Sequence, residues 1–240
     1  TKRVEEGLRV LEEFQGGDFR KIRYEVYGIE KALFKPRIKG LYLIIDPSFC
    51  DCFEVAKMAI EAGVRIIQIR DKRGNVREFL KIAEAIRSLS DEITLIINDR
   101  LDVALSISAD GLHLGQSDLP IEYAKERFYG IIGLSCHSVD EAIKAEKDGT
   151  DYIGIGPIFK TKTKPGLSPI GYEIIKQLKQ KIKIPVVAIG GINLENIEKV
   201  EDADSIAVSS AILESKDVKD GIRPLILTIG NIYHFSKNRE

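Results

Sequence analysis

The sequence predicts an α/β fold, a (β/α)8 TIM barrel with an N-terminal helical hairpin extension. Three observations support this prediction. From residue 40 onward, short runs of apolar, β-branched residues alternate with amphipathic segments, as parallel strands covered by helices do. Glycines and polar residues follow these runs, at the ends where a barrel carries its active face. The length of 240 residues suits one large domain of this type.

The first part of the chain has a different pattern. Apolar residues recur at helical spacing over residues 4–14 and again over 22–33, and Gly16-Gly17 separates the two stretches. Such a hairpin cannot bury both apolar stripes alone, so it must dock on the barrel, on another chain or on further residues. We therefore expect a helical extension over residues 1–36 and a barrel domain over 37–240.

The barrel elements follow in the order that the fold requires. The predicted strands cover residues 40–46, 65–70, 94–98, 111–115, 131–136, 152–156, 185–190 and 205–209. The predicted helices cover residues 53–62, 76–88, 121–128, 139–148, 170–181 and 194–201. Residues 216–240 are polar and weakly patterned, and we expect a last helix and a loose tail there. A doubly wound open sheet is the alternative, but the first strand runs into Asp46-Pro47-Ser48 rather than a glycine-rich turn.

Composition narrows the class of function. The chain has 36 Lys and Arg against 37 Asp and Glu, a net charge of -1, whereas nucleic-acid binding requires a basic face. There is no run of about 18 apolar residues to span a membrane and no basic-then-apolar leader. We therefore expect a cytoplasmic protein that acts on small molecules, without a nucleic-acid or membrane partner. The sequence leaves open whether it forms a homo-oligomer.

The three cysteines, Cys50, Cys52 and Cys136, indicate a reducing compartment without structural disulfides. Cys50-Asp51-Cys52 could form half of a metal site, but the chain has no second Cys/His pair to complete it. Two small residues at the start of a helix are the favoured interpretation.

The loop after the sixth strand is the most distinctive stretch. Residues 160–166 read Lys-Thr-Lys-Thr-Lys-Pro-Gly, so three ammonium groups alternate with two hydroxyls. Lysine supplies charge, and the hydroxyls and backbone N–H groups supply directional donors, which together favour phosphate. Gly190-Gly191 and Ser209-Ser210 end the last two strands, where barrels often bind a second phosphate through backbone N–H groups.

A second polar group follows the second strand. Gln68, Arg70 and Lys72 alternate there, so the period of two places them on one side. Arginine can hold a phosphate through two hydrogen bonds, and lysine adds a point charge. The alternative for Arg70 is a stabilising ion pair, for example with Asp99, because buried charges are usually paired.

Two aspartates follow the third and fourth strands. Asp99 and Asp118 suit Mg2+, which commonly uses one or two carboxylates together with substrate phosphates. Alternatively, Asp99 caps the following helix and Asp118 forms a turn before a proline. Ser135 ends the fifth strand without a Gly-x-Ser-x-Gly motif, so we interpret it as a phosphate donor rather than a nucleophile. His137 is interpreted as structural or as a helix-entry residue.

In their number and order these motifs resemble those of the thiamine-phosphate synthase family, over about residues 40–213. The motifs are Gln68-x-Arg70-x-Lys72, Asn98-Asp99, Asp110-Gly111-Leu112-His113-Leu114-Gly115-Gln116-x-Asp118, Gly133-x-Ser135-x-His137, Gly154-x-Gly156-Pro157, Thr161-x-Thr163-Lys164, Gly190-Gly191-Ile192 and Ser209-Ser210-Ala211-Ile212. Residues 1–35 lie outside this core and look like the end of a helical segment that precedes the synthase in some longer fused proteins.

The resemblance implies that a pyrimidine diphosphate loses pyrophosphate with Mg2+ as cofactor, and that a thiazole phosphate nitrogen attacks the methylene carbon to give thiamine phosphate. It assigns the residues as follows. The catalytic group would be Arg70, Lys72 and Lys164. The pyrimidine diphosphate would be bound by these three with Gln68, Asn98 and Ser135. Mg2+ would be held by Asp99 and Asp118. The thiazole phosphate would be held by Thr161, Thr163, the Gly191 amide and the backbone of Ser209 and Ser210.

Three other functions remain as alternatives. A related thiazole tautomerase shares the barrel, but we expect it to lack the two metal aspartates and to rely on a histidine. A non-catalytic sensor would bind phosphate ligands with the same residues and use the helical hairpin to bind a partner. An isomerase barrel of the tryptophan-synthesis type needs an acid–base pair near its sugar, which we do not find in the sequence. The presence of both Asp99 and Asp118 favours the synthase.

Overall fold

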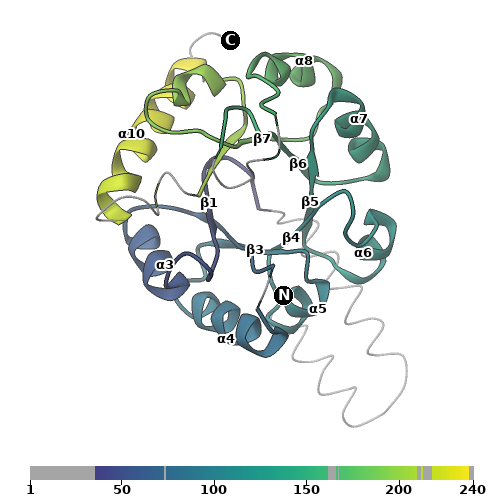
Figure 1. Cartoon of the computed structure of the whole chain (residues 1–240), viewed down its shortest axis with the longest axis vertical. Coiled ribbons are helices and arrows are strands. Elements are labelled where there is room, and N and C mark those ends of the chain that lie inside the picture. Colours follow the sequence, from purple (N-terminus) through teal and green to yellow (C-terminus); the bar gives the residue numbers. More distant parts are fainter. Residues whose placement is uncertain are drawn as a thin grey trace.

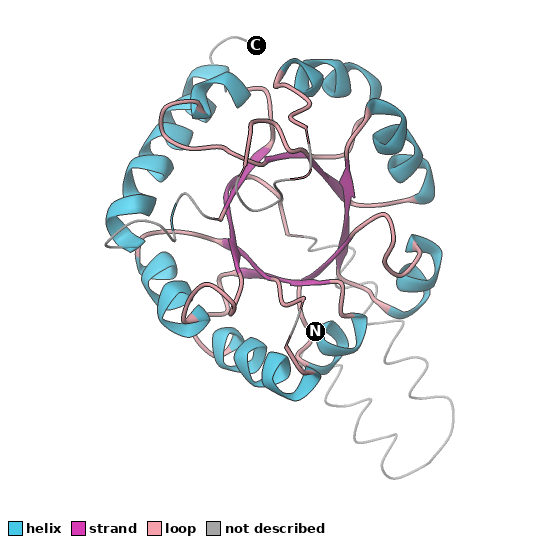
Figure 2. Cartoon of the chain, viewed as in Figure 1, coloured by secondary structure: helices cyan, strands magenta, loops and turns pink. Residues whose placement is uncertain are grey.

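The computed structural model describes residues 36–72, 74–161, 166, 168–209, 212 and 218–237. Within these residues, eight parallel strands close into a barrel and helices form a ring around it (Figures 1 and 2). The predicted (β/α)8 barrel is thus confirmed. The helical extension expected over residues 1–36 lies outside the described part, apart from residue 36.

Each strand pairs with its neighbours in sequence, and the last strand pairs with the first. The strands are β1 Gly40–Ile45, β2 Ile66–Ile69, β3 Thr94–Asn98, β4 Gly111–Leu114, β5 Ile131–Cys136, β6 Tyr152–Ile155, β7 Val186–Ile189 and β8 Ser205–Val208. All eight lie within one residue of the predicted bounds. The agreement is close because strands buried on both faces leave uninterrupted apolar runs in the sequence.

The helices that surround the barrel depart more from expectation. The described helices are α3 Cys52–Glu61, α4 Val76–Arg87, α5 Leu101–Ser106, α6 Ile121–Arg127, α7 Val139–Asp148, α8 Glu173–Lys181, the short 3-10 helix η1 Ile197–Val200, and α10 Val218–Lys237. The sequence analysis missed α5, which has only six residues and therefore little periodicity to detect. None of the described helices is both long and apolar enough to cross a membrane.

Two predicted helices are shorter than expected for identifiable reasons. The helix expected from residue 170 begins at Glu173, because Gly171 has a φ of 83°, which is outside the right-handed helical region. The helix expected over 194–201 is only the 3-10 turn η1. There, the side chains of Asn193 and Asn196 accept hydrogen bonds from nearby backbone N–H groups, which competes with helix formation.

The last helix, α10, is longer than expected. Its residues Ile222, Leu225, Ile229 and Ile232 recur at helical spacing and are buried, and the helix lies against β1 and α3 (Figure 1). The prediction of a loose tail is therefore wrong for the residues up to Lys237, where the helix ends. The sequence pattern was weak because Pro224, which lies inside the helix, normally ends one, and because the apolar Ile226 and Leu227 interrupt the spacing of these positions.

The alternation of side chains along the strands gives the barrel two apolar cores. One lies between the strands and the helices. The other fills the barrel itself and consists of Ile38, Tyr42, Ile44, Ile66, Ile96, Ile131, Tyr152, Val187 and Ala207. Because the side-chain period in a strand is two, the inward positions nearer the strand carboxyl ends include Gln68, Asn98, His113 and Ser135. The polar groups therefore rest directly on an apolar floor.

Gly133 in β5 makes room for the largest side chain of this inner core. A Cβ atom at this position would lie 2.1 Å from Cζ of Tyr152, a ring that is fully buried. The position therefore has to be glycine for packing reasons rather than for backbone conformation.

We expect Gly133→Ala to lower the free energy of unfolding by roughly 1–3 kcal/mol, because an extra methyl group in a packed core forces neighbours to move. Gly230→Ala is the matched control, since a Cβ there meets nothing within 4 Å. In the helix α10 it should raise stability by about 0.5–1 kcal/mol. Urea unfolding measures both, and equal effects would contradict the packing argument.

Candidate active site

A cavity opens at the carboxyl ends of the barrel strands, on the face where barrels place their chemistry. The predicted site residues that line it are Gln68, Arg70, Asn98, Ser135, Thr161, Gly191 and Ser209. Lys72, Asp99 and Asp118 follow the same strand ends but are not part of its lining. Thr163, Lys164 and Ser210 lie outside the described residues.

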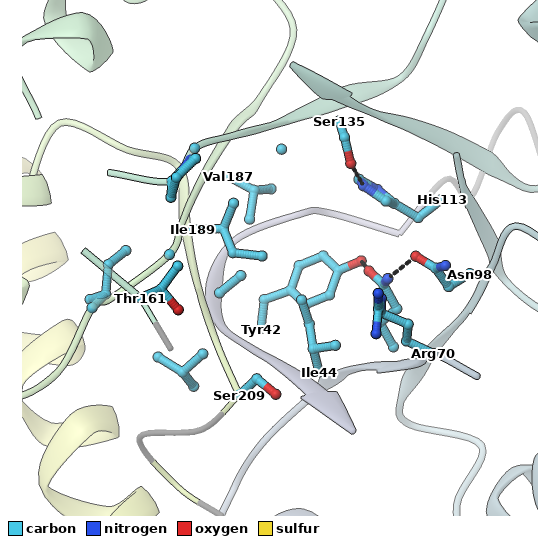
Figure 3. Close-up of a pocket in the computed structure, with 18 of the residues that line it drawn as sticks. Tyr42, Ile44, Arg70, Asn98, His113, Ser135, Thr161, Val187, Ile189 and Ser209 are labelled. Atoms are coloured by element: carbon cyan, nitrogen blue, oxygen red, sulfur yellow. Dashed lines mark hydrogen bonds between the residues drawn. The ribbon is translucent and has the colours of Figure 1, made fainter. Parts of the chain in front are cut away.

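The polar groups of the cavity fall into two sets (Figure 3). Arg70, Asn98 and Ser135 lie on one side, and Thr161 and Ser209 lie on the other. The floor between the two sets is largely apolar and is formed by Tyr42, Ile44, Val187 and Ile189. Such a cavity suits a ligand, or a pair of ligands, with a polar group at each end and a flat apolar middle.

Arg70 is held by an aspartate that the sequence analysis did not single out. Its Nη1 lies 2.9 Å from Oδ2 of Asp46, which is buried at the end of β1. The backbone N–H of Ser48 donates to the other carboxylate oxygen at 2.9 Å. The ion pair considered as the alternative for Arg70 is therefore present, but its partner is Asp46 rather than Asp99. A guanidinium has five N–H donors, so pairing with Asp46 fixes its orientation while leaving donors for a ligand.

Lys72 lies between the two predicted metal aspartates. Its Nζ is 2.5 Å from Oδ2 of Asp99 and 3.9 Å from Oδ1 of Asp118. Burial, followed by the hydrogen bond with the Asp118 carboxyl, raises the pKa of Asp99. Two carboxylates this close repel each other when both are ionised, and a cation between them relieves the repulsion. In this structure the ammonium group of Lys72 takes that position.

The alternative roles of the two aspartates have different outcomes. Asp99 does not cap the following helix, because the N-cap of α5 is Arg100 and no side chain caps it. Asp99 also has a φ of 62°, in the left-handed region that few residues other than glycine adopt. Asp118 does form the expected turn, since its Oδ2 accepts from the N–H of Gly115 at 2.7 Å. The other carboxylate oxygen of Asp118, Oδ1, faces Lys72.

The donor set at these aspartates fits a hard divalent cation. Carboxylate oxygens are the ligands that Mg2+ prefers, and one cationic atom, Nζ of Lys72, already reaches both Asp99 and Asp118. Among the described residues, no group of three or more His, Cys, Asp or Glu side chains could hold a metal. A cation at these two carboxylates would therefore complete its shell with ligand or water oxygens, as Mg2+ commonly does.

A row of hydrogen-bonded side chains crosses the barrel interior and lines the cavity. It runs from β3 through β2, β1, β6 and β4 to β5, and three of its bonds are drawn in Figure 3. The bonds are Gln68 to Asn98 at 2.7 Å, Tyr42 to Gln68 at 2.6 Å, Tyr42 with Tyr152 at 3.0 Å, Tyr152 with His113 at 3.1 Å, and His113 with Ser135 at 2.9 Å. We call these six residues the interior row.

The direction of each bond in the interior row follows from its ends. Gln68 Oε1 can only accept, so Tyr42 donates to it. Tyr42 must then accept from the hydroxyl of Tyr152, and Tyr152 accepts from Nδ1–H of His113. Nε2 of a neutral imidazole is an acceptor, so the Ser135 hydroxyl donates to it. The row thereby selects one tautomer of His113.

The two tyrosines keep their protons. Burial, helped by the neighbouring Tyr152, raises the pKa of Tyr42 well above its ordinary value. Burial also raises the pKa of Tyr152. Both hydroxyls therefore remain donors at neutral pH. The sequence analysis did not single out Tyr42, Tyr152 or His113 as site residues, although their inward positions on alternating strands could have identified them.

His137 has a structural role, which is one of the two expected for it. Its Nδ1 lies 2.5 Å from the carbonyl oxygen of Gly156, and its backbone N–H donates to Glu141. It thereby ties the end of β5 to the end of β6 at the wall of the cavity.

On the opposite side of the cavity, two glycines let neighbouring loops meet. A Cβ at Gly190 would lie 2.6 Å from Cα of Pro157, and one at Gly191 would lie 2.4 Å from the carbonyl oxygen of Lys160. Their φ values of 99° and 69° also favour glycine. The loop after β7 therefore packs directly against the start of the lysine- and threonine-rich loop, and this contact places Thr161 and Gly191 in one cavity wall.

Comparison with known proteins agrees with this geometry. A profile of the family described as thiamine monophosphate synthase matches residues 41–212. The thiamine-phosphate synthase of Methanospirillum hungatei is 45% identical over 190 residues, which cover 75% of this chain and 92% of that protein. The thiamine-phosphate synthase of a Synechococcus strain is 37% identical over 256 aligned positions, which cover 95% of this chain and 72% of that protein.

A solved structure is similar as well. The thiamine phosphate pyrophosphorylase from Pyrococcus furiosus has a TM-score of 0.74 and 39% sequence identity, with 80% of this chain and 96% of that chain covered. The match of the profile to most of the chain, together with relatives of this identity and coverage, assigns the protein. The chain belongs to the thiamine monophosphate synthase family.

Proposed function

We propose that this chain carries out the coupling reaction of its family with the assistance of Mg2+. In that reaction, 4-amino-5-hydroxymethyl-2-methylpyrimidine diphosphate and a thiazole phosphate give thiamine phosphate and pyrophosphate. The observation that carries the proposal is the cavity with two polar ends and an apolar floor between them. Each phosphorylated substrate can place its anionic group at one end, and the two rings can meet over the floor.

The side with Arg70 is proposed to bind the diphosphate. Asp46 orients the guanidinium, and Asn98 is oriented by the amide of Gln68. Lys72 and Lys164 add positive charge, and the Ser135 hydroxyl, which now donates to His113, would turn to donate to the diphosphate. Preorganised donors and charges of this kind stabilise a departing diphosphate more than a freely reorganising solvent does.

Asp99 and Asp118 are proposed to hold Mg2+ beside this group. When bound there, Mg2+ would neutralise negative charge on the diphosphate oxygens. Lys72, which now lies between both carboxylates, would then turn its ammonium group toward the diphosphate.

The opposite side is proposed to bind the thiazole phosphate through Thr161, Thr163, the Gly191 amide and the backbone of Ser209 and Ser210. The thiazole nitrogen already has a lone pair, so its attack needs no general base. The aminopyrimidine can delocalise positive charge at its methylene carbon, so the C–O bond can break before that attack. The main role of the apolar floor residues would then be to keep water away from the positively charged methylene carbon of the pyrimidine.

The interior row is proposed to hold His113 and Ser135 in place beneath the diphosphate. Because each hydroxyl in the row is hydrogen-bonded to a neighbour, Ser135 is connected to Asn98 by a continuous chain of hydrogen bonds. Tyr42 and Tyr152 are thus positioning residues that act through His113.

The remaining expectations about partners and compartment are also proposals. We propose that the enzyme works in the cytoplasm on small phosphorylated substrates, without a nucleic-acid or membrane partner. The near balance of 36 basic and 37 acidic residues and the three free thiols of the described residues support this.

We expect thiamine phosphate to form from the two substrates with Mg2+ present and to stop forming when a chelator is added. Binding of the thiazole phosphate alone, measured by calorimetry, should survive the chelator, because its proposed donors do not include the metal. Product formation in the chelated enzyme would contradict the role of the metal. Absence of product from a folded enzyme under both conditions would contradict the proposed reaction.

We expect Asp99→Ala and Lys164→Ala each to reduce turnover by about 100-fold or more, because each removes charge stabilisation of the departing diphosphate. Asp102→Ala and Lys181→Ala are the matched controls, since both residues are exposed on the outer helices. Steady-state kinetics with each variant provides the measurement. Turnover like that of the wild type in either site variant would remove that residue from the proposed site.

We expect Tyr152→Phe to lower kcat/KM by about three- to tenfold, the range of one hydrogen bond, while the ring still fills the core. Since Nδ1 of His113 loses its acceptor, the 15N signals of this imidazole should shift toward the other tautomer. Tyr129→Phe, at an exposed tyrosine, is the control. An unchanged His113 spectrum would show that the interior row does not set the tautomer.

A further inference from the structure

Two thiols face each other in the loop between β1 and α3. The sulfur atoms of Cys50 and Cys52 lie 4.0 Å apart, and both thiols are free. Between them, Asp51 caps α3 by accepting hydrogen bonds from the N–H groups of Phe53 and Glu54. Neither thiol has a part in the proposed coupling reaction, so their close approach requires another explanation.

The backbone between the two cysteines is compatible with a disulfide. Asp51 is extended, with φ of -72° and ψ of 100°, which holds the flanking Cα atoms roughly 5.5–7 Å apart. Disulfides span Cα distances up to about 6.8 Å. The sulfurs need to approach by about 2 Å to reach bonding distance. Cys50 is only half-buried, so it has room to rotate.

The two thiols differ in a way that assigns them different roles. The hydrogen bond from Cys52 lowers the pKa of Cys50. The same bond, followed by burial, raises the pKa of Cys52. Cys50 is thus the more exposed sulfur and the more easily ionised one, and the thiolate is the nucleophile in thiol–disulfide exchange. Cys52 is placed behind it as the resolving thiol.

We propose that Cys50 and Cys52 form a thiol–disulfide exchange site for low-molecular-weight disulfides such as glutathione disulfide. The Cys50 thiolate attacks one sulfur of the small disulfide, which forms a mixed disulfide and releases the first small thiol. The Cys52 sulfur then attacks Cys50 and releases the second. Two protein thiols are oxidised to one disulfide, the small disulfide is reduced to two thiols, and the two protons from the protein pass to them.

Closure of this disulfide acts on the proposed diphosphate side of the cavity. The Cys50 thiol donates to the carbonyl oxygen of Asp46 at 3.6 Å, and the N–H of Phe49 donates to the same oxygen at 2.9 Å. The carboxylate of Asp46 holds Arg70. Turning Cys50 toward Cys52 removes its bond to this segment, so the anchor of Arg70 loosens. The oxidised enzyme should therefore use the diphosphate substrate less well, a consequence that rests on the proposed function.

The test treats the full chain with glutathione disulfide and follows both mass and activity. We expect the mass to fall by two hydrogens and peptide mapping to join Cys50 to Cys52. Cys136 serves as an internal control, because burial raises its pKa to about 12 and it should stay reduced. We expect kcat/KM for the pyrimidine diphosphate to fall on the order of tenfold, as small misplacements of binding groups do, and to recover with dithiothreitol.

Single variants separate the two steps. In the Cys52→Ser variant the reaction should stop at a mixed disulfide, with one glutathione on Cys50. The Cys50→Ser variant should take up no glutathione. The double variant should keep its activity in the oxidant. Failure of Cys50 and Cys52 to join in the folded protein, as checked by far-UV circular dichroism, would overturn the exchange site even if the coupling reaction is confirmed. A disulfide that forms without a change in kcat/KM would overturn its link to Arg70.

Discussion

The hydrogen bond between the hydroxyls of Tyr42 and Tyr152, 3.0 Å long, joins the two halves of the barrel interior. A buried hydroxyl without a partner is costly, so two tyrosines inside an apolar core need each other and need further partners on both sides. Gln68 and His113 supply them. Among the described residues, Nε of Arg87 is the only buried side-chain nitrogen or oxygen atom that lacks a hydrogen-bond partner. These hydrogen bonds fix the orientation of the polar side chains that line the cavity.

Two described cationic side chains at the strand ends, Arg70 in the cavity and Lys72 beside it, are already paired with carboxylates before any ligand binds. Arg70 pairs with Asp46, and Lys72 with Asp99 and Asp118. The counterions keep the partly buried charges oriented, which reduces the reorganisation needed when an anionic substrate arrives. The two pairs differ in one respect. Asp46 holds an arginine that keeps further donors, whereas the two aspartates at Lys72 can exchange their lysine for a divalent cation.

The barrel strands could be predicted almost completely from the sequence, the helices around them less well, and the site only in part. The strands were found because their apolar runs are continuous, but the short helix α5 left too weak a pattern. Gln68, Arg70, Asn98, Ser135, Thr161, Gly191 and Ser209 were expected at the site and line one cavity. Asp46 and the two tyrosines were not expected, because an aspartate before a proline and aromatic residues in strands have ordinary structural explanations.

The barrel, the face on which the polar residues gather and the family whose motifs they form are all readable in the sequence. These follow from local patterns, since periodicity and strand ends depend on residues close together in the chain. Which of those residues contact one another is visible in the folded barrel alone. The interior row links β3 to β5 through β1, and Asp46 meets Arg70 across 24 positions. Such contacts depend on barrel closure and strand register, which no local pattern encodes.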